Sequence, residues 1–187
     1  MNYKLYNIPS ELLFNIHNNK AKLAFFLFEK YVNGAIIQWD RINTLNSILN
    51  KLAKTVNTTK LMVRREFWQK HEMMFLDVHY YFICGDKVDK LFQLFCSYEE
   101  DPLLRPLKRQ YLRKLKIFKE ARDMIEHIDK NVKNNCTDLG NIINDTYTFG
   151  GKKFDISKKG LNSLIDLYNA VIELLKSRNN TRISSQS

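Results

Sequence analysis

Proline, glycine and cysteine are all scarce in this chain, which has three, six and three of them among 187 residues. Proline and glycine interrupt helices most often, so their scarcity lets long helices run unbroken. The cysteines, at positions 84, 96 and 136, form no CxxC pair. This spacing argues against a zinc site, and we expect reduced thiols in a reducing compartment.

Long apolar runs are also missing. The longest, such as Leu23 to Phe28, are far shorter than the roughly 20 apolar residues of a membrane-spanning helix. The opening residues, MNYKLYNIPSELL, lack the positively charged segment followed by an apolar segment that marks a signal peptide. We therefore expect a cytoplasmic protein that does not enter a membrane.

The signatures of several enzyme classes are missing as well. The chain contains no GxxxxGKS/T, GxGxxG or GxSxG motif, and His17, His71 and His79 have no metal-ligand spacing such as HExxH. ATPase, dinucleotide-dependent and serine-hydrolase activities are therefore unsupported. We expect neither a metal site nor a cofactor.

Acidic residues are outnumbered by basic ones. Asp and Glu together number 20 against 30 Lys and Arg, which gives a net charge of +10. An excess of this size favours polyanionic partners, and nucleic acid first among them. Because the same excess can serve solubility alone, the position of the basic residues has to decide between the two explanations.

Apolar residues recur at helical spacing through most of the chain. Pro9-Ser10-Glu11 predicts a helix start, and Asn33-Gly34 is a C-cap signal that predicts the end of that helix. Glu99-Glu100-Asp101-Pro102 predicts a clear break. Two further helices are expected between these signals: one at 38–55, and one from Thr58 or Thr59 to about Ile83, with a kink at Gly85-Asp86 before a segment at 88–98.

After a long helix predicted at 104–134, the pattern changes. Residues 146–156 alternate around Gly150-Gly151, which predicts a short β-hairpin, and Ser157 or Asp155 then caps a last helix. We predict an all-α fold, an up-and-down helical bundle with this hairpin before its last helix, in one domain at 1–178 with a disordered polar tail at 179–187. Helix content should reach roughly 60% or more, about twice the globular average.

The helix predicted at 104–134 has two different sides. With about 100° per residue, its apolar residues fall within roughly 80° of Arg122 and form the core stripe. The other side is cationic and includes Asp123 and His127. A cationic surface with an embedded histidine is what RNA binding and acid–base chemistry at a phosphodiester require. The basic residues expected to bind RNA are Arg105, Arg109, Arg113, Lys116 and Lys119.

The segment Arg122-Asp123-Met124-Ile125-Glu126-His127 carries a family resemblance. An Arg followed by a polar residue, with His five positions after the Arg, resembles the signature of HEPN domains (higher eukaryotes and prokaryotes nucleotide-binding). The resemblance implies a compact helical bundle, often a homodimer. Many members are metal-independent ribonucleases of toxin–antitoxin or phage-defence systems, and others are inactive and only bind.

On this resemblance, Arg122 and His127 are the candidate catalytic residues and Asp123 supports the histidine. The 2′-hydroxyl of RNA attacks the adjacent phosphate, His127 takes or delivers a proton, and Arg122 stabilises the charge on the phosphoryl oxygens. The resemblance also implies two motifs facing one cleft in a homodimer, with a cognate antitoxin or defence-system protein as a further partner. An inert HEPN-like module that binds RNA or protein is the first alternative. Plain ion pairing of Arg122 with Glu126 and with Asp129 is the simplest explanation of the motif.

A helix-turn-helix DNA-binding protein is the second alternative. Residues 52–63, LAKTVNTTKLMV, loosely fit that motif. Ala53 falls where the motif needs a small residue, and Asn57 falls at the left-handed turn position. Arg64 and Arg65 follow and suit phosphate contacts. Glu66-Phe67-Trp68 fits a recognition helix poorly, which favours a loop between two helices of a bundle.

Overall fold

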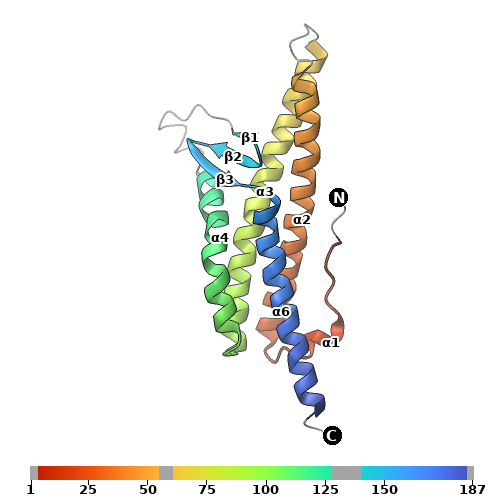
Figure 1. The fold of residues 1–187 in the computed structure, drawn as a ribbon, viewed down its shortest axis with the longest axis vertical. Coiled ribbons are helices and arrows are strands. Elements are labelled where there is room, and N and C mark those ends of the chain that lie inside the picture. Colours follow the sequence, from red (N-terminus) through yellow and green to blue (C-terminus); the bar gives the residue numbers. More distant parts are fainter. Residues whose placement is uncertain (1–3, 55–60, 128–139, 185–187) are drawn as a thin grey trace.

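The computed structural model describes residues 4–54, 61–127 and 140–184. Five helices account for 78% of the described residues, and a small three-stranded antiparallel sheet lies near the C-terminus (Figure 1). The prediction of a mainly helical fold, with a short β element before the last helix, is confirmed.

The first half of the chain forms a long antiparallel helical hairpin. A single-turn helix, α1 (Ser10–Leu13), precedes α2 (Asn19–Ala53) and α3 (Leu61–Glu99), which lie side by side (Figure 1). The side chain of Asn18 caps α2 by accepting hydrogen bonds from two backbone N–H groups of its first turn, at 2.8 and 3.4 Å. The start predicted at Pro9-Ser10-Glu11 therefore belongs to α1, and the long helix begins at Asn19.

Two glycines inside these helices allow close approaches. The helix end predicted at Asn33-Gly34 is wrong, because α2 runs through it, and α3 runs through Gly85-Asp86 in the same way. A Cβ on Gly34 would lie 2.9 Å from Sγ of Cys84, and a Cβ on Gly85 would lie 2.0 Å from the ring of Phe118. Glycine is present at these positions because a neighbouring helix occupies the space of a side chain.

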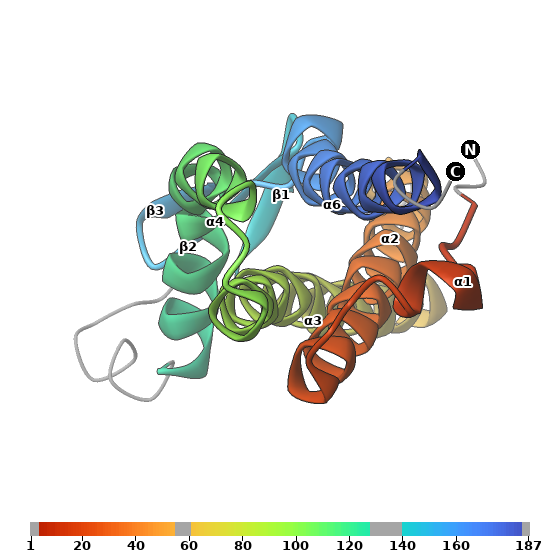
Figure 2. The same cartoon turned by 90° about the horizontal axis from the view of Figure 1, so that it is seen from below.

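Two further helices complete a four-helix bundle. α4 (Leu104–Glu126) follows a break at 99–102, where Glu100 has a positive φ of 53°, and this break was predicted. α6 (Lys158–Ser184) returns along α4, and successive long helices alternate in direction (Figure 1). Seen from below, α2 stands diagonally across the bundle from α4 (Figure 2).

The ends of these two helices differ from the prediction. α4 ends at Glu126, eight residues before position 134, and residues 128–139 lie outside the described part of the chain. The backbone of α6 is helical to Ser184, through most of the tail at 179–187 that was predicted to be disordered.

The sheet consists of β1 (Asn141–Ile143), β2 (Thr146–Phe149) and β3 (Lys152–Asp155), paired in that order. Each turn has two residues with positive φ, Asn144-Asp145 and Gly150-Gly151, as two-residue type I′ hairpin turns require. The hairpin predicted at 146–156 is confirmed. β1 is an additional strand, and the Asn-Asp pair is the sequence signal that could have revealed it.

Aromatic packing joins the sheet to the bundle. Phe82 on α3 contacts Tyr147 and Phe154 of the sheet, with ring centroids 6.4 and 5.8 Å apart, and it contacts Phe118 of α4 at 6.2 Å. Trp39 of α2 donates a hydrogen bond to the carbonyl of Ile156 at 2.9 Å. Because Ile156 lies two residues before the start of α6, these contacts set the position of that helix relative to α4.

Candidate functional site

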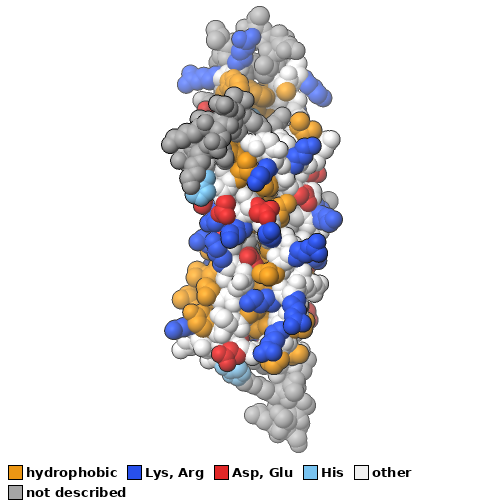
Figure 3. All heavy atoms as spheres, turned by 90° about the vertical axis from the view of Figure 1, so that its left-hand side faces the viewer, with side chains coloured by type: hydrophobic (Ala, Val, Ile, Leu, Met, Phe, Trp, Pro, Cys, Tyr) orange, Lys and Arg blue, Asp and Glu red, His pale blue; other side chains and the backbone are white. Residues whose placement is uncertain are grey.

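The outward side of α4 carries a row of basic residues. Burial of its apolar residues against the bundle turns the opposite side of the helix to solvent; the buried residues are Leu104, Tyr111, Leu115, Phe118, Ala121 and Ile125. Arg109, Lys116 and Lys119 lie within about 40° of Arg105 around the helix axis, and all four are exposed. We call these four residues the basic stripe. Figure 3 views this side of the molecule and shows Lys and Arg side chains along its middle and lower part.

The fifth residue predicted to bind RNA lies beside this stripe. Arg113 is exposed and stands about 80° from Arg105 around the helix axis. It lines a groove between α4 and α6 rather than the most exposed side of α4. The structure therefore places four of the predicted RNA-binding residues in one row and the fifth at its edge.

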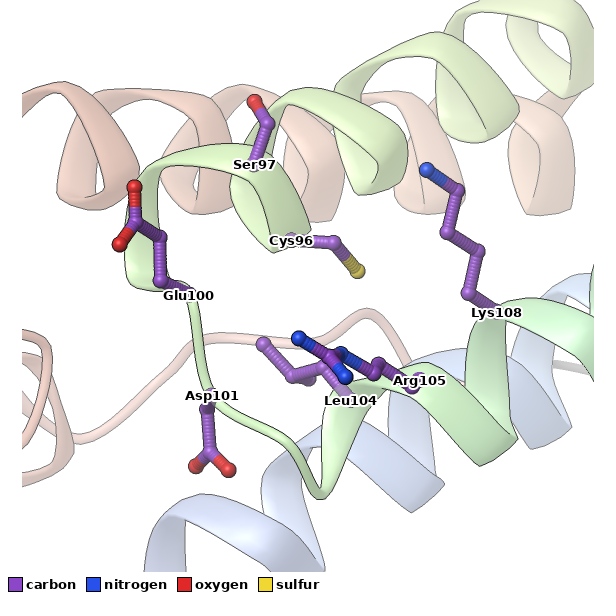
Figure 4. A pocket seen from close by; sticks show the side chains of 7 residues that line it. All are labelled: Cys96, Ser97, Glu100, Asp101, Leu104, Arg105 and Lys108. Carbon is purple, nitrogen blue, oxygen red and sulfur yellow. The ribbon is translucent and has the colours of Figure 1, made fainter.

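A hollow of about 340 Å³ lies at the lower end of the stripe, where α3 turns into α4. Figure 4 shows the thiol of Cys96 pointing into the hollow between Arg105 and Lys108, while the carboxylates of Glu100 and Asp101 point away from the hollow. Burial raises the pKa of the Cys96 thiol to about 11, against the effect of nearby Lys108. A raised pKa keeps the thiol mostly protonated at neutral pH, which disfavours its use as a nucleophile.

Arg122 points toward α3. One guanidinium nitrogen is 3.5 Å from the carboxylates of both Asp86 and Glu126, and a second nitrogen pairs with Asp123. The side chain of Arg122 is 18% exposed and that of Asp86 only 1%. Asp86 also accepts a hydrogen bond from Lys90 at 2.7 Å. The pair with Glu126 that the sequence offered as the simplest explanation is present, and the charge of Arg122 is already balanced by carboxylates.

His127 has a different environment. It is exposed and follows the last residue of α4, where its backbone N–H donates a hydrogen bond to the carbonyl of Asp123 at 3.2 Å. The carboxylate of Asp123, expected to support His127, pairs with Arg122. The three candidate catalytic residues thus lie within one or two turns of the chain, but Arg122 faces a buried carboxylate and His127 faces solvent.

The sequence did not reveal two neighbours of this region on α3. Asp86 lies four residues after buried Phe82 and so shares its core-facing side, a spacing that could have flagged a buried carboxylate. His79 is half-buried, and burial lowers its pKa against the opposing effect of the Glu126 carboxylate. Carboxylates therefore dominate the surroundings of Arg122, which is unfavourable for a phosphate.

The helix-turn-helix alternative finds little support in the described residues. Helices of that motif meet at about 90–120°, whereas α2 and α3 lie antiparallel and Arg41 pairs with Asp77 across them at 3.0 Å. Arg64 and Arg65 are exposed near the start of α3. Residues 55–60, which contain the proposed turn, lie outside the described part of the chain.

Within the described ranges, no helix has an apolar stretch of the length needed to cross a bilayer. Comparisons with protein-family models, with curated proteins and with solved structures found no match to this chain. The resemblance to HEPN domains therefore stays a prediction that rests on Arg122, Asp123 and His127.

Proposed function

We propose that this protein binds RNA through the basic stripe of α4. The observation that supports the proposal best is the alignment of Arg105, Arg109, Lys116 and Lys119 along the exposed side of one helix. Such a row spaces positive charges along a line, as contacts to successive phosphates of a strand require. The segment of α4 that carries this row, 105–119, contains no carboxylate. Glu120, the next residue, pairs with Lys116.

Metal-independent RNA cleavage is the second candidate function. It is favoured by the exposed position of His127 at the upper end of the same helix, where a strand on the stripe can reach it. The geometry of Arg122 weighs against it, because the guanidinium would have to leave Asp86 before it could contact a phosphate. Binding without cleavage is therefore the function that the arrangement supports better.

Loss of two stripe charges is expected to weaken RNA binding. The double variant Arg109→Gln/Lys119→Gln should bind a short single-stranded RNA about tenfold less tightly near 0.15 M salt, because each phosphate contact contributes about 0.7 to the salt slope of single-strand binding. Fluorescence anisotropy between roughly 0.05 and 0.2 M salt measures both the affinity and the slope, which should fall by about 1.4.

The matched control is Lys30→Gln/Lys51→Gln, which removes the same charge from α2, diagonally across the bundle from α4 (Figure 2). Its affinity should stay close to that of the wild type, apart from a small effect of net charge. Equal losses in both double variants would show that overall charge, and not the stripe, accounts for binding. A clear preference of the wild type for duplex DNA would favour the helix-turn-helix alternative.

Cleavage can be tested separately from binding. If the protein is a ribonuclease, it should cut single-stranded RNA in excess EDTA and leave cyclic or 3′-phosphate ends, and His127→Ala should slow the reaction by about 10²–10⁴-fold, as loss of a general acid or base does. The same variant should retain RNA affinity and melting temperature, because His127 is exposed. RNA that stays intact with the wild type would leave binding as the function.

The cleavage proposal also includes the homodimer that the family resemblance implies. Light scattering of the purified protein at micromolar concentration should then give twice the mass of one 22.2 kDa chain. A strict monomer would remove the shared cleft, and with it the pairing of two histidines, without affecting RNA binding by the stripe. An antitoxin or defence-system partner is likewise part of this second proposal.

A further inference from the structure

A second basic region borders the stripe on the side of α6. A groove of about 770 Å³ lies between α4 and the first turns of α6. Arg113 and Lys114 line it from α4, and Lys158 and Lys159 line it from α6. The two pairs are far apart in the sequence, so the packing of α6 against α4 is what brings them to one site.

The groove has an excess of positive charge. Its four basic residues face two acidic ones, Asp155 and Asp166, which leaves a net charge of +2. Asp155 is already engaged, because its carboxylate accepts a hydrogen bond from the N–H of Ser157 at 2.8 Å. Among the described residues, Arg113, Lys114 and Lys159 form no ion pair, although the Lys114 ammonium lies 5.0 Å from the Tyr111 ring centroid. These ammonium and guanidinium groups are therefore available to an anion.

The start of α6 adds to the positive potential of the groove. A helix N-terminus carries about half a positive charge, and the first three residues of α6, Lys158 to Gly160, line the groove. Its backbone donors are partly used, since the N–H of Lys159 donates to Oγ of Ser157 at 3.2 Å. The ammonium groups of Lys114 and Lys159 would thus make the main contacts with an anion.

The size and composition of the groove fit more than a simple ion. Ligand sites in proteins commonly measure about 300–1,000 Å³ and combine apolar surface with a few polar groups. Half-buried Ile117 supplies apolar lining here, and Asn162 and Ser163 supply polar groups. A phosphate with its attached sugar fits this combination, whereas an isolated anion would leave the apolar lining unused.

We propose that this groove binds a phosphate group of the RNA strand that lies along the basic stripe. Arg113 is four residues from Arg109 and three from Lys116, so the groove opens directly beside the stripe. Lys114 stands about 180° from Arg105 around the helix axis, so a strand on the stripe reaches the groove by turning over Arg113, and it can then place one phosphate between Lys114 and Lys159. The inference rests on the proposed RNA binding and adds a phosphate position that the sequence pattern of α4 did not indicate.

The test uses Lys114→Gln/Lys159→Gln in the full chain. Anisotropy titrations compare it with the wild type, with the stripe variant and with the Lys30→Gln/Lys51→Gln control. Two single-stranded RNA probes of the same sequence are used, one with a 5′-phosphate and one with a 5′-hydroxyl. The groove variant should bind about fourfold less tightly near 0.15 M salt, with a salt slope lower by about 0.7, as loss of one phosphate contact implies. Melting curves followed by circular dichroism check that every variant is folded.

The outcomes separate the groove from the stripe. A loss with both probes identifies an internal phosphate in the groove, and a loss with only the phosphorylated probe identifies the terminal phosphate; either result supports the inference. If the groove variant binds both probes as tightly as the control while the stripe variant is weakened, the groove inference is overturned and RNA binding stands. If the wild type binds neither probe, both proposals are wrong.

Discussion

Replacing Arg122 with alanine is expected to lower the free energy of unfolding by about 3 kcal/mol, the lower end of the cost of breaking a buried ion pair. The carboxylate of Asp86 is 1% exposed and would lose one of its two cationic partners, keeping only Lys90. For a domain of this size the change corresponds to a fall of roughly 6–12 °C in melting temperature. Thermal or denaturant unfolding followed by circular dichroism measures it.

A double variant tests the cause of this loss. In Arg122→Met/Asp86→Asn both charges are removed, so no buried carboxylate is left with a missing partner. The double variant should be more stable than the sum of the two single variants predicts, with a coupling energy of about 1–3 kcal/mol for residues in contact. The control Arg109→Ala, on the exposed side of α4, should change stability by at most about 0.5 kcal/mol.

The result bears directly on the catalytic hypothesis. If Arg122→Ala lowers stability as expected, a loss of RNA cleavage in that variant says nothing about catalysis unless the assay is run well below its melting temperature. If instead Arg122→Ala melts like the wild type, the pair with Asp86 contributes little, and Arg122 is free to act at a phosphate. That outcome would move metal-independent cleavage ahead of simple binding.

Replacing Gly85 with alanine should destabilise the contact between α3 and α4. A Cβ at this position would lie 2.0 Å from Cδ1 of Phe118, whose ring is fully buried. Alanine gains about 1 kcal/mol of helix propensity over glycine, but overpacking a core typically costs about 1–3 kcal/mol and occasionally more. Because the ring has to move and not merely tilt, we expect the upper end of this cost and a net loss of about 2 kcal/mol, measured by denaturant unfolding.

Gly34→Ala is the matched control for this substitution. Gly34 also lies in the interior of a long helix, but its nearest neighbour would be the end of one side chain, Sγ of Cys84 at 2.9 Å. That sulfur can shift at little cost, so Gly34→Ala should lose clearly less stability than Gly85→Ala. In the Phe118→Ala background the added methyl group has room, and Gly85→Ala should then be neutral or stabilising. An equal loss with and without Phe118 would show that the backbone, and not the ring, sets the cost.

Gly85 and Asp86 together explain how α4 packs on α3. Gly85 makes room for Phe118, and Asp86, the next residue, pairs with Arg122, one turn after Phe118. The two predictions above therefore concern one contact region with an apolar half and an ionic half. This region holds α4 so that its basic stripe faces solvent, which links the stability of the bundle to the proposed RNA-binding surface.

The periodicity of the sequence was enough to identify the two sides of α4. Apolar residues at helical spacing placed Leu115 and Phe118 in the core, and the same spacing placed Arg109 and Lys116 on the opposite side. It also placed Arg122 within the core stripe, where the structure finds it mostly buried. The hairpin at 146–156 was equally predictable, because a Gly-Gly pair between alternating residues is a local signal.

Only the tertiary structure decided which residues meet across helices. A glycine within a helical pattern has the same local signal whether it ends the helix or makes room for a neighbour, so Asn33-Gly34 predicts a helix end although Gly34 in fact makes room for Cys84. The partner of Arg122 was hidden for the same reason, since Asp86 is 36 positions earlier in the chain. The groove lined by Lys114 and Lys159 also exists only because α6 packs against α4. Local spacing determines which side of a helix is buried, but the contacts on that side depend on the helix that covers it.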